Sequence, residues 1–303
     1  MKSLGCIEVI KPGLLDLVMD LGRPGWGAQG LPAGGAADAR ALVAANRLLG
    51  NPDSAAGLEL LGFGPTLGFP QGGRVALGGG EIEASMEGVP ISAGQQVQLF
   101  PGATLCLGRI LGGCRAYLAV AGGIAAPCLL GGRSSFLPGG FGGHDGRALK
   151  MGDRLALGTP QDKAKPRLLP VSKTSVNDAI RVLPAAQIGG FADEALTAMA
   201  KSAYRVLPDS NRVGLRLAGK PLHYFGEELP SQGVLPGAIQ VPPDGQPIIL
   251  GWDGPVTGGY PVIAAVIAAD LPKLAQLSPG DAVRFVFVTR SQALAIWREE
   301  GWA

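Results

Sequence analysis

Short apolar runs separated by turn residues dominate the chain. Many have the length and alternation typical of strands and are bounded by Gly, Pro or Asp. Runs of this kind cover residues 74–80, 96–108, 115–123, 153–158, 212–219, 237–241, 246–250 and 282–288. Turns that recur at this spacing favour barrels or sandwiches over alternating strand–helix units.

A few stretches instead place apolar residues at helical spacing. ADARALVAANRLLG, residues 37–50, leads into Gly50-Asn51-Pro52, which is a typical stop signal. DEALTAMAKSAY, residues 193–204, follows a turn with Asp193 as the expected cap, and SQALAIWREEGW lies close to the C-terminus. The predicted fold class is therefore mainly β with a few short helices.

The chain of 303 residues is long enough for two domains. The best linker candidate is TPQDKAKPRLLPVSK, residues 159–173, which has little periodicity. We expect a division near residue 165, into an N-terminal β-barrel domain (1–165) and a C-terminal β-barrel domain (166–303). LKMGDRLALG and LSPGDAVRFVF, in the two halves, both place a Gly-Asp turn before an alternating strand. They fit two related β domains in tandem, or two unrelated hairpins, because Gly-Asp turns are common.

Composition narrows the class of protein. Apolar residues make up 47% of the chain, charged residues 17%, and the net charge is +2 without charge blocks, which does not favour nucleic acid or an anionic membrane surface. The segment MKSLGCIEVI has no long apolar core typical of a secretory signal, so we expect a cytoplasmic protein. The four cysteines of the chain show no CxxC spacing and are predicted to be reduced core thiols.

Several kinds of chemistry are excluded by missing motifs. The sequence has no GxxxxGK[ST] phosphate loop and no GxSxG nucleophile elbow. Its two histidines, His144 and His223, lie near no cysteine pair and form no HExxH motif, so we expect no metal site. Any catalysis would use carboxylates, arginines, amides and backbone donors.

Two Gly-rich segments of the N-terminal half are candidate anion sites. DLGRPGWGAQGLPAGGAAD contains Asp20 and Arg23 and leads into the helix that carries Asn46. It could receive an anion at the helix start, or be a loop fixed by an Asp–Arg pair. GGFGGHDGRALKMGD surrounds Arg147, whose planar fork suits carboxylate or phosphate, although glycines this dense favour turns at strand crossings.

The C-terminal half gathers polar residues at strand ends and turns. They are Arg212, Gln240, Asp253, Thr257 and Tyr260, next to the Gly258-Gly259 pair. A carboxylate, a guanidinium and an amide beside a Gly-Gly backbone suit a small polar substrate, and the structural alternative is a β-turn fixed by Asp253. We expect Arg212, Gln240 and Asp253 to meet around one solvent-reachable pocket.

Ordered sequence blocks carry a family resemblance. DLGRPGWGAQGLPAGGAAD, AANRLLGNP, YLAVAGGI, SNRVGLRLAG, GVLPGAIQVPPDGQPIIL and TGGYPVIA resemble the allophanate-hydrolase-subunit-2 family, from about residue 13 to 287. Membership implies two tandem cyclophilin-like β-barrel domains and a separate cyclophilin-like partner of the subunit-1 type. It implies a role in ATP-dependent opening of 5-oxoproline to glutamate, with ATP bound at the level of the complex.

The same family includes two other activities. One is carboxyl transfer to urea or another small amide from biotin carried in trans. The other is non-catalytic antagonism of a histidine-kinase inhibitor. This chain departs from common family patterns at Met19 and Pro255, where relatives often carry glutamine, and at Val256, where they often carry threonine. The loss of each hydrogen bond would weaken the binding of a polar ligand by about 0.5–1.5 kcal/mol.

Residues and resemblance together give a set of expected roles. The predicted catalytic residues are Asp253, Arg212 and Asp20. The predicted substrate-binding residues are Gln240, Thr257, Gly258, Gly259, Tyr260, Arg23, Asn46 and Arg147.

Overall fold

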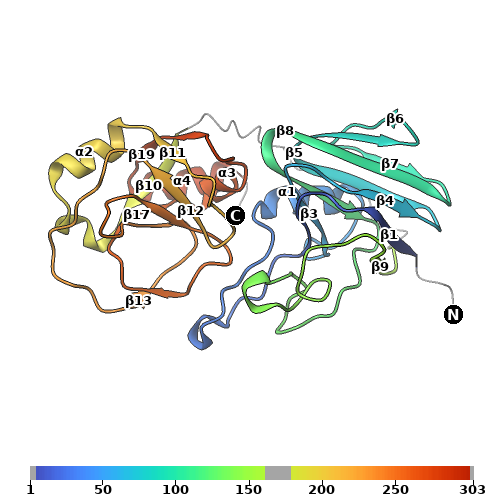
Figure 1. Cartoon of the computed structure of the whole chain (residues 1–303), viewed down its shortest axis with the longest axis horizontal. Helices are drawn as coiled ribbons and strands as arrows, with labels where there is room; N and C mark the ends of the chain where they lie inside the picture. The colour runs from blue at the N-terminus through green and yellow to red at the C-terminus, as the bar shows by residue number, and fades with distance from the viewer. Residues whose placement is uncertain (1–4, 161–178, 301–303) are drawn as a thin grey trace. The chain divides into compact units, whose positions relative to one another are not determined.

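The computed structural model describes residues 5–160 and 179–300 (Figure 1). Contacts divide the chain into two compact units, Met1–Pro24 with Gly34–Val171, and Gly25–Ala33 with Ser172–Ala303. The short segment Gly25–Ala33 thus groups with the second unit, although it lies inside the predicted N-terminal domain. The expected boundary near residue 165 falls outside the described residues and stays a prediction.

The first unit is built on one nine-stranded sheet with the order β2-β3-β8-β4-β1-β9, in which β5 pairs with β6, β7 and β8. The strands are β1 (Cys6–Lys11), β2 (Asp16–Met19), β3 (Gly57–Leu61), β4 (Thr66–Phe69), β5 (Gly73–Met86), β6 (Val89–Pro90), β7 (Gln96–Leu99), β8 (Ala103–Val120) and β9 (Arg154–Ala156).

The long strand β8 makes this sheet curl. Its first part pairs with β4, its last part pairs with β3, and β5 runs along it with two register shifts. Alternate residues of the shorter strands, such as Ile7 and Val9 or Leu58 and Leu60, are buried in one core cluster. This period of two is the pattern by which the strands were predicted.

Helix α1 (Ala39–Leu48) covers part of β5 and β8. The Asp38 side chain caps it by accepting a hydrogen bond from the Ala41 N–H at 3.0 Å. The helix approaches β5 so closely that a Cβ on Gly78 would lie 2.5 Å from the Ala41 carbonyl oxygen. After the helix, Gly50 adopts a φ of 71°, which confirms the predicted stop.

The second unit contains an eight-stranded sheet with the order β18-β11-β12-β15-β14-β17-β10-β19. The strands are β10 (Ile180–Pro184), β11 (Tyr204–Val206), β12 (Gly214–Ala218), β14 (Ala238–Gln240), β15 (Ile248–Leu250), β17 (Val262–Val266), β18 (Ala282–Val283) and β19 (Phe285–Phe287). The first and last strands of this order, β18 and β19, are separated along the chain only by Arg284. The two ends of the sheet therefore meet, and the sheet curls into a barrel.

A separate ribbon accompanies this barrel. It consists of β13 (Gln232–Gly233) and β16 (Thr257–Gly258), which pair with each other and with no strand of the eight-stranded sheet. The remaining helices of the described chain are α2 (Asp193–Lys201), α3 (Leu271–Ala275) and α4 (Arg290–Glu299), and the 3-10 turns are η1 (Gly27–Gln29), η2 (Leu137–Gly139), η3 (Ala186–Gly190) and η4 (Ala268–Asp270).

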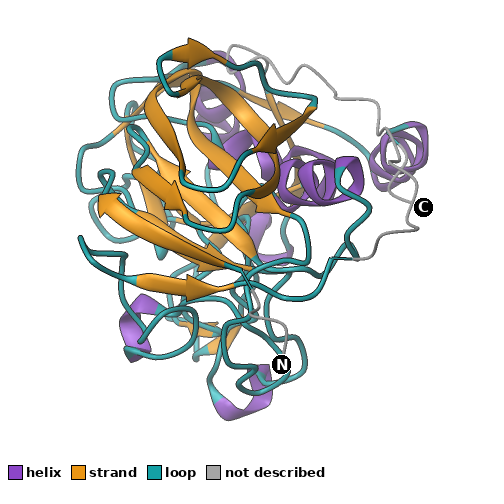
Figure 2. Cartoon of the chain, turned by 90° about the vertical axis from the view of Figure 1, so that its right-hand side faces the viewer, coloured by secondary structure: helices purple, strands orange, loops and turns teal. Residues whose placement is uncertain are grey.

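The predicted helices are present, but one cap differs from expectation. Asp193 is the first residue of α2, the cap position is taken by Ala192, and no side chain caps this helix. Helix α4 has a full capping box, in which Thr289 and Gln292 each bond the other's backbone N–H. Strands predominate over helices (Figure 2), so the predicted fold class is confirmed.

The two Gly-Asp turns noted in the sequence have the same hydrogen bonds. Asp153 accepts from the Lys150 N–H at 2.7 Å, and Asp281 accepts from the Ser278 N–H at 2.7 Å. Each aspartate also donates its own N–H to the carbonyl three residues earlier. The turns precede β9 and β18, so the resemblance between the two segments extends to their local structure.

The cysteines are all unpaired thiols, as expected. The expectation that they belong to the core is wrong for Cys106 and Cys128, which are exposed. Cys106 occupies an outward-facing position of β8, where burial alternates along the strand.

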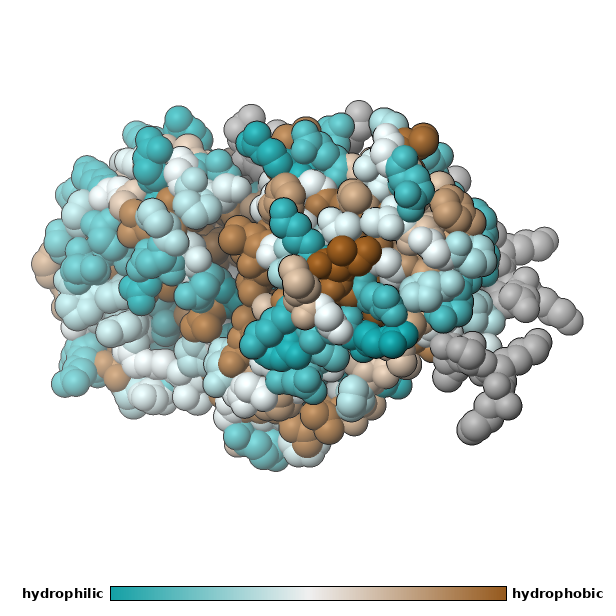
Figure 3. Space-filling view, turned by 45° about the vertical axis from the view of Figure 1, so that its right-hand side comes forward, coloured by the Kyte–Doolittle hydropathy of each residue, from teal (hydrophilic) through white to brown (hydrophobic). Residues whose placement is uncertain are grey.

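Exposed apolar side chains lie between hydrophilic ones on the face shown in Figure 3. Across residues 5–160 and 179–300, no helix has the length and hydropathy needed to span a membrane.

Candidate functional site

Gln240, the last residue of β14, presents a buried amide next to the ribbon. Its side chain is 4% exposed, and its Nε2 atom has no hydrogen-bond partner. A Cβ on Gly258 of β16 would lie 2.5 Å from this Nε2. The predicted residues Gln240 and Gly258 are thus brought together, and the missing side chain of Gly258 lets the amide pack directly against β16.

A second amide lies on the same side of the ribbon. Gln232 of β13 is the direct partner of Gly258, and partners in an antiparallel pair point to the same face. The Oε1 of Gln232 accepts a hydrogen bond of 2.7 Å from the Nε2 of Gln187 in η3. Its own Nε2 is buried without a partner. Gln232 and Gln187 were not predicted, because nothing in the sequence links their positions.

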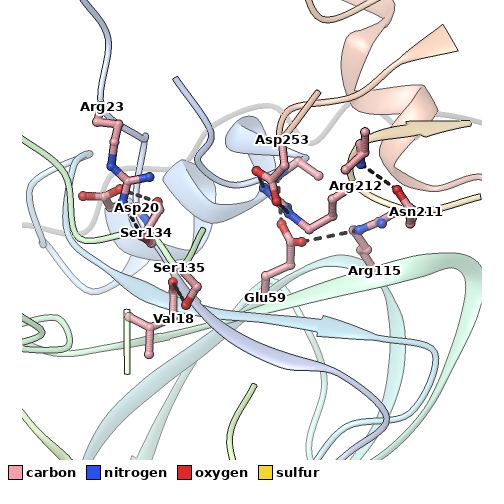
Figure 4. Close-up of polar contacts among 12 residues, drawn as sticks. Val18, Asp20, Arg23, Glu59, Arg115, Ser134, Ser135, Asn211, Arg212 and Asp253 are labelled. Atoms are coloured by element: carbon pink, nitrogen blue, oxygen red, sulfur yellow. Dashed lines mark hydrogen bonds and ion pairs between the residues drawn. The ribbon is translucent and has the colours of Figure 1, made fainter. Parts of the chain in front are cut away.

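Arg212 and Asp253 form a buried ion pair, as Figure 4 shows. The guanidinium donates from Nε and Nη2 to the two carboxylate oxygens at 2.7 and 3.0 Å. The Asp253 N–H also donates to the Arg212 carbonyl at 3.0 Å. This pair holds the turn that starts the segment leading to Gly258.

The expectation that Gln240 joins this pair is contradicted by the strand register. Gln240 lies beside Ile248 in the β14–β15 ladder. Ile248 is the first residue of β15, whereas Leu250, its last residue, pairs with Gly214 of β12. Arg212 comes just before β12 and Asp253 just after β15, so both lie beyond this second end of β15. The structure therefore brings together Arg212 with Asp253, and Gln240 with Gly258, at opposite ends of the ladder. The segment 251–261 connects them.

Thr257, Gly259 and Tyr260 flank Gly258 and are all exposed. A Cβ on Gly259 would meet nothing closer than 3.8 Å, the distance to the Leu229 carbonyl oxygen. Neither Gly258 nor Gly259 has a positive φ, so their backbone conformations are open to other residues. At Gly258 the absence of a side chain therefore matters for space and not for backbone conformation.

In the first unit, Asp20 fixes a loop. Its carboxylate accepts hydrogen bonds from the Gly22 N–H at 2.8 Å, the Arg133 N–H at 2.6 Å and the Ser134 hydroxyl at 2.5 Å. The fully buried Arg23 donates to the Ser134 carbonyl (Figure 4), and its guanidinium lies 4.9 Å from the centre of the Phe141 ring. The contacts of Asp20 match the structural alternative, but its partners are backbone groups and Ser134 in place of Arg23.

Arg147 and Asn46 are also engaged locally. Arg147 binds both oxygens of Asp153 at 2.7 and 2.9 Å, and this guanidinium lowers the pKa of Asp153. The buried Asn46 donates to the Ala55 carbonyl at 2.8 Å and accepts from Asn51 at 3.0 Å. These contacts fix a turn and a helix end, and the binding roles expected for Arg147 and Asn46 stay predictions.

A buried polar network in the first unit was missed by sequence reasoning. The Tyr117 hydroxyl donates to Glu59 Oε2 at 2.8 Å, and the same oxygen accepts from the Ala37 N–H at 2.8 Å. Arg115 lies 3.5 Å from Glu59 Oε1. Burial is the largest cause raising the pKa of Tyr117. The signal was available, since Glu59 interrupts the apolar strand GLELL.

Two surface hollows lie in the first unit, of about 280 and 270 Å³. Gln71, Arg74 and Gln98 contribute polar side chains to the first, and Asn51, Ser54 and Arg133 to the second. Neither is lined by a predicted site residue. The buried amides of Gln232 and Gln240 have unpartnered Nε2 atoms beside Gly258, and they form the candidate site.

Known proteins match the chain over almost its whole length. It is 38% identical to the C subunit of 5-oxoprolinase from Escherichia coli (strain K12), covering 95% of this chain and 93% of that protein. It is 34% identical to the protein of the same name from Haemophilus influenzae, covering 93% and 91%. The urea amidolyase of Lachancea kluyveri is 34% identical, but the match spans only 17% of that protein.

Solved structures agree with this kinship. The match to the crystal structure of the Kluyveromyces lactis urea carboxylase covers 99% of this chain and 29% of the carboxylase chain, with a TM-score of 0.92 and 30% identity. The family model described as carboxyltransferase domain, subdomain A and B, matches residues 29–287. The resemblance predicted from the sequence blocks is confirmed, and the chain belongs to the family of carboxyltransferase domain subdomains A and B.

Proposed function

We propose that this chain is a subunit of an ATP-dependent 5-oxoprolinase that opens the cyclic amide of 5-oxoproline to give glutamate. The observation that carries the proposal is the match to the C subunit of 5-oxoprolinase, which spans 95% of this chain and 93% of the relative. A match of that extent corresponds to the whole relative, whereas the urea amidolyase match corresponds to a small part of a larger protein.

The candidate site around Gly258 suits this chemistry. The amide of Gln240 can donate a hydrogen bond to the ring carbonyl of the substrate, whereas Thr257, the neighbour of Gly258 in β16, points to the opposite face of the ribbon. Backbone N–H groups of Gly258 and Gly259 would stabilise negative charge that develops on the carbonyl oxygen during ring opening. The Arg212–Asp253 pair would hold the segment that carries these groups. Asp20, Arg23, Asn46 and Arg147 would support the fold of the first unit.

The activity is expected only in an assembly. The sequence has no phosphate-binding loop, so we assign ATP binding to the complex and not to this chain alone. The partner would be a cyclophilin-like protein of the subunit-1 type, together with a further protein. We expect the assembly to act in the cytoplasm.

Reconstitution tests the proposal. The chain would be co-expressed with the two partner proteins, and ATP-dependent glutamate formation from 5-oxoproline would be measured. We expect activity in the full assembly and its loss when this chain is omitted. Full activity without this chain would refute the assignment.

Carboxyl transfer from biotin carried by another protein is the second candidate. It is favoured by the carboxyltransferase family model and by the TM-score of 0.92 to urea carboxylase. A buried amide donor fits the oxygen of a small amide in this reaction too. Avidin added to the reconstituted assembly separates the candidates, because it would block a biotin-dependent reaction and leave 5-oxoproline opening unchanged.

A further inference from the structure

Two unpartnered amide donors flank one glycine in the second unit. The Nε2 atoms of Gln232 and Gln240 are both buried and make no hydrogen bond. Leaving a buried donor unsatisfied costs about 1–3 kcal/mol, so two of them at one place need an explanation. The strand register places Gln232 directly opposite Gly258, and the missing side chain of Gly258 points at Gln240.

The amide of Gln232 has a fixed orientation. Gln187 donates from Nε2 to Gln232 Oε1 at 2.7 Å, which leaves the Nε2 of Gln232 as the group available to another molecule. The position thus offers a donor and not an acceptor. Together with Gln240 it presents donors on the face of the ribbon where Gly258 has no side chain.

The chemistry of these groups selects the ligand. Both donors are neutral amides, and the groups nearest to a Cβ on the neighbouring Gly259 are the Leu229 carbonyl and the Ser231 hydroxyl, which are also neutral. Arg212 lies at the other end of the ladder, paired with Asp253. Neutral donors suit a neutral carbonyl oxygen, whereas a carboxylate makes its strongest hydrogen bonds with charged donors.

We propose that Gln232 and Gln240 form a binding site for the carbonyl oxygen of a small amide, with Gln187 as the residue that positions Gln232 and Gly258 as the residue that lets the Gln240 amide reach the ribbon. The class of ligand is a neutral lactam or ureido carbonyl. Naming the lactam of 5-oxoproline as the natural ligand rests on the proposed function, whereas the site itself does not.

Access to the buried donors is provided by the ribbon. Strands β13 and β16 share only two residue pairs and join no strand of the barrel sheet. So few backbone pairs open at low free-energy cost compared with the sheet. Binding of the ligand therefore involves displacement of the ribbon, and the bound oxygen then holds it through the two amides.

Binding to the purified full chain tests the site without any assay of activity. The probes are 2-pyrrolidinone, which has the lactam carbonyl alone, 5-oxoproline, which adds a carboxylate, and L-proline, which has the carboxylate without the lactam. Ligand-observed NMR titration would give the affinities. We expect 2-pyrrolidinone and 5-oxoproline to bind and to compete with each other, and L-proline not to compete.

Two glycines of the ribbon provide a matched pair of variants. A Cβ at Gly258 would lie 2.5 Å from the Gln240 Nε2 and would push this amide away, while a Cβ at Gly233 of β13 meets nothing within 4 Å. We expect Gly258→Ala to lower the affinity for 2-pyrrolidinone at least about tenfold and Gly233→Ala to leave it within about twofold. The melting temperature of each variant checks that it is folded.

Gln187→Glu tests whether Gln187 orients the Gln232 amide or only supports the fold. A glutamate at 187 accepts hydrogen bonds, so the Gln232 amide would turn its NH2 group toward residue 187 and its oxygen toward Gly258. We expect about two- to tenfold weaker 2-pyrrolidinone binding, as for the loss of one hydrogen bond, at an unchanged melting temperature. Gln187→Ala would cause a smaller loss, because it leaves the orientation of Gln232 open.

The outcomes separate this inference from the proposed function. If no probe binds the wild-type chain, or if Gly258→Ala and Gly233→Ala bind the probes alike, the carbonyl site is refuted, even if the assembly opens 5-oxoproline. If the probes bind as expected but the assembly forms no glutamate, the site stands and the proposed function fails.

Discussion

Asp253 accepts two hydrogen bonds from the guanidinium of Arg212, and both side chains are almost fully buried. The geometry is bidentate, which is the strongest arrangement of this pair. The pair ties the start of β12 to the turn after β15, and so determines where the segment toward Gly258 begins.

Removing one partner of this pair should destabilise the second unit strongly. Asp253→Ala leaves a buried guanidinium without its carboxylate, and we expect the free energy of unfolding to fall by about 3–5 kcal/mol in urea titrations. The exposed pair Arg216–Asp209, with N–O 3.1 Å, provides the control. Asp209→Ala should change stability by less than about 1 kcal/mol. Equal effects of the two substitutions would contradict this account.

Asp16 predicts a pH dependence of stability in the first unit. Burial raises the pKa of this carboxyl from 3.8 to about 6. The native state therefore holds a proton that the unfolded chain has released between about pH 4 and 6. The free energy of unfolding should fall as the pH rises through this window, by up to about 3 kcal/mol, and stay low above it.

Asp16→Asn tests this sign. The amide oxygen can still accept the hydrogen bond that the Gly13 N–H gives to the carboxylate at 2.6 Å, but the side chain cannot ionise. We expect the variant to be more stable than the wild type at pH 8 and similar to it near pH 4, in thermal unfolding at both values. A variant that loses stability at pH 8 would show that the carboxylate is not under strain from burial.

Asp153 predicts the opposite pH dependence. Its pKa is lowered, first by the hydrogen bonds from Arg147 and further by the Lys150 N–H and by His144. Its contribution is present above the pKa of the unfolded chain and is lost as the pH falls toward the lowered native pKa. Asp153→Asn should therefore cost about 1 kcal/mol at pH 7 and progressively less below about pH 4. A cost that does not change with pH would contradict the ion pair as its cause.

The hydroxyl of Tyr117 is predicted to be structural. It donates to Glu59 and accepts from the Asp38 N–H at 2.7 Å, so Tyr117→Phe leaves buried groups without partners. We expect a loss of about 1–3 kcal/mol in the free energy of unfolding. Tyr260→Phe serves as the control, because that side chain is exposed and its hydroxyl remains in water. An unchanged free energy of unfolding for Tyr117→Phe would show that the network is not required for stability.

The strands and α1 were predictable because each alternates or repeats apolar residues in one short stretch of sequence. Gln240 was also recognisable, since it lies at the end of such a strand-like stretch. Gln187 and Gln232 were not, because they lie 45 residues apart and the hydrogen bond between their side chains forms only in the folded chain. Arg212, Gln240 and Asp253 were expected to converge, but convergence depends on strand register, and composition does not determine register.

Asn46 and Arg147 show how local pairing competes with ligand binding. Both are residue types that often bind ligands, and their Gly-rich surroundings favoured that interpretation, which stays a prediction. Each finds its partners within ten residues, at Asn51 and Ala55 or at Asp153. Asp193 likewise has the residue type of a cap, but it lies one position inside the helix. Such shifts of one residue are decided by the turn before the helix.

The most direct test is the kcat/KM of the reconstituted assembly for ATP-dependent opening of 5-oxoproline, with Gly258→Ala compared with Gly233→Ala. The account predicts at least a tenfold loss, about 1.4 kcal/mol, for Gly258→Ala, and a value within about twofold of wild type for Gly233→Ala. Wild-type kcat/KM for an assembly with a folded Gly258→Ala chain would contradict a substrate site at Gln240 and Gly258.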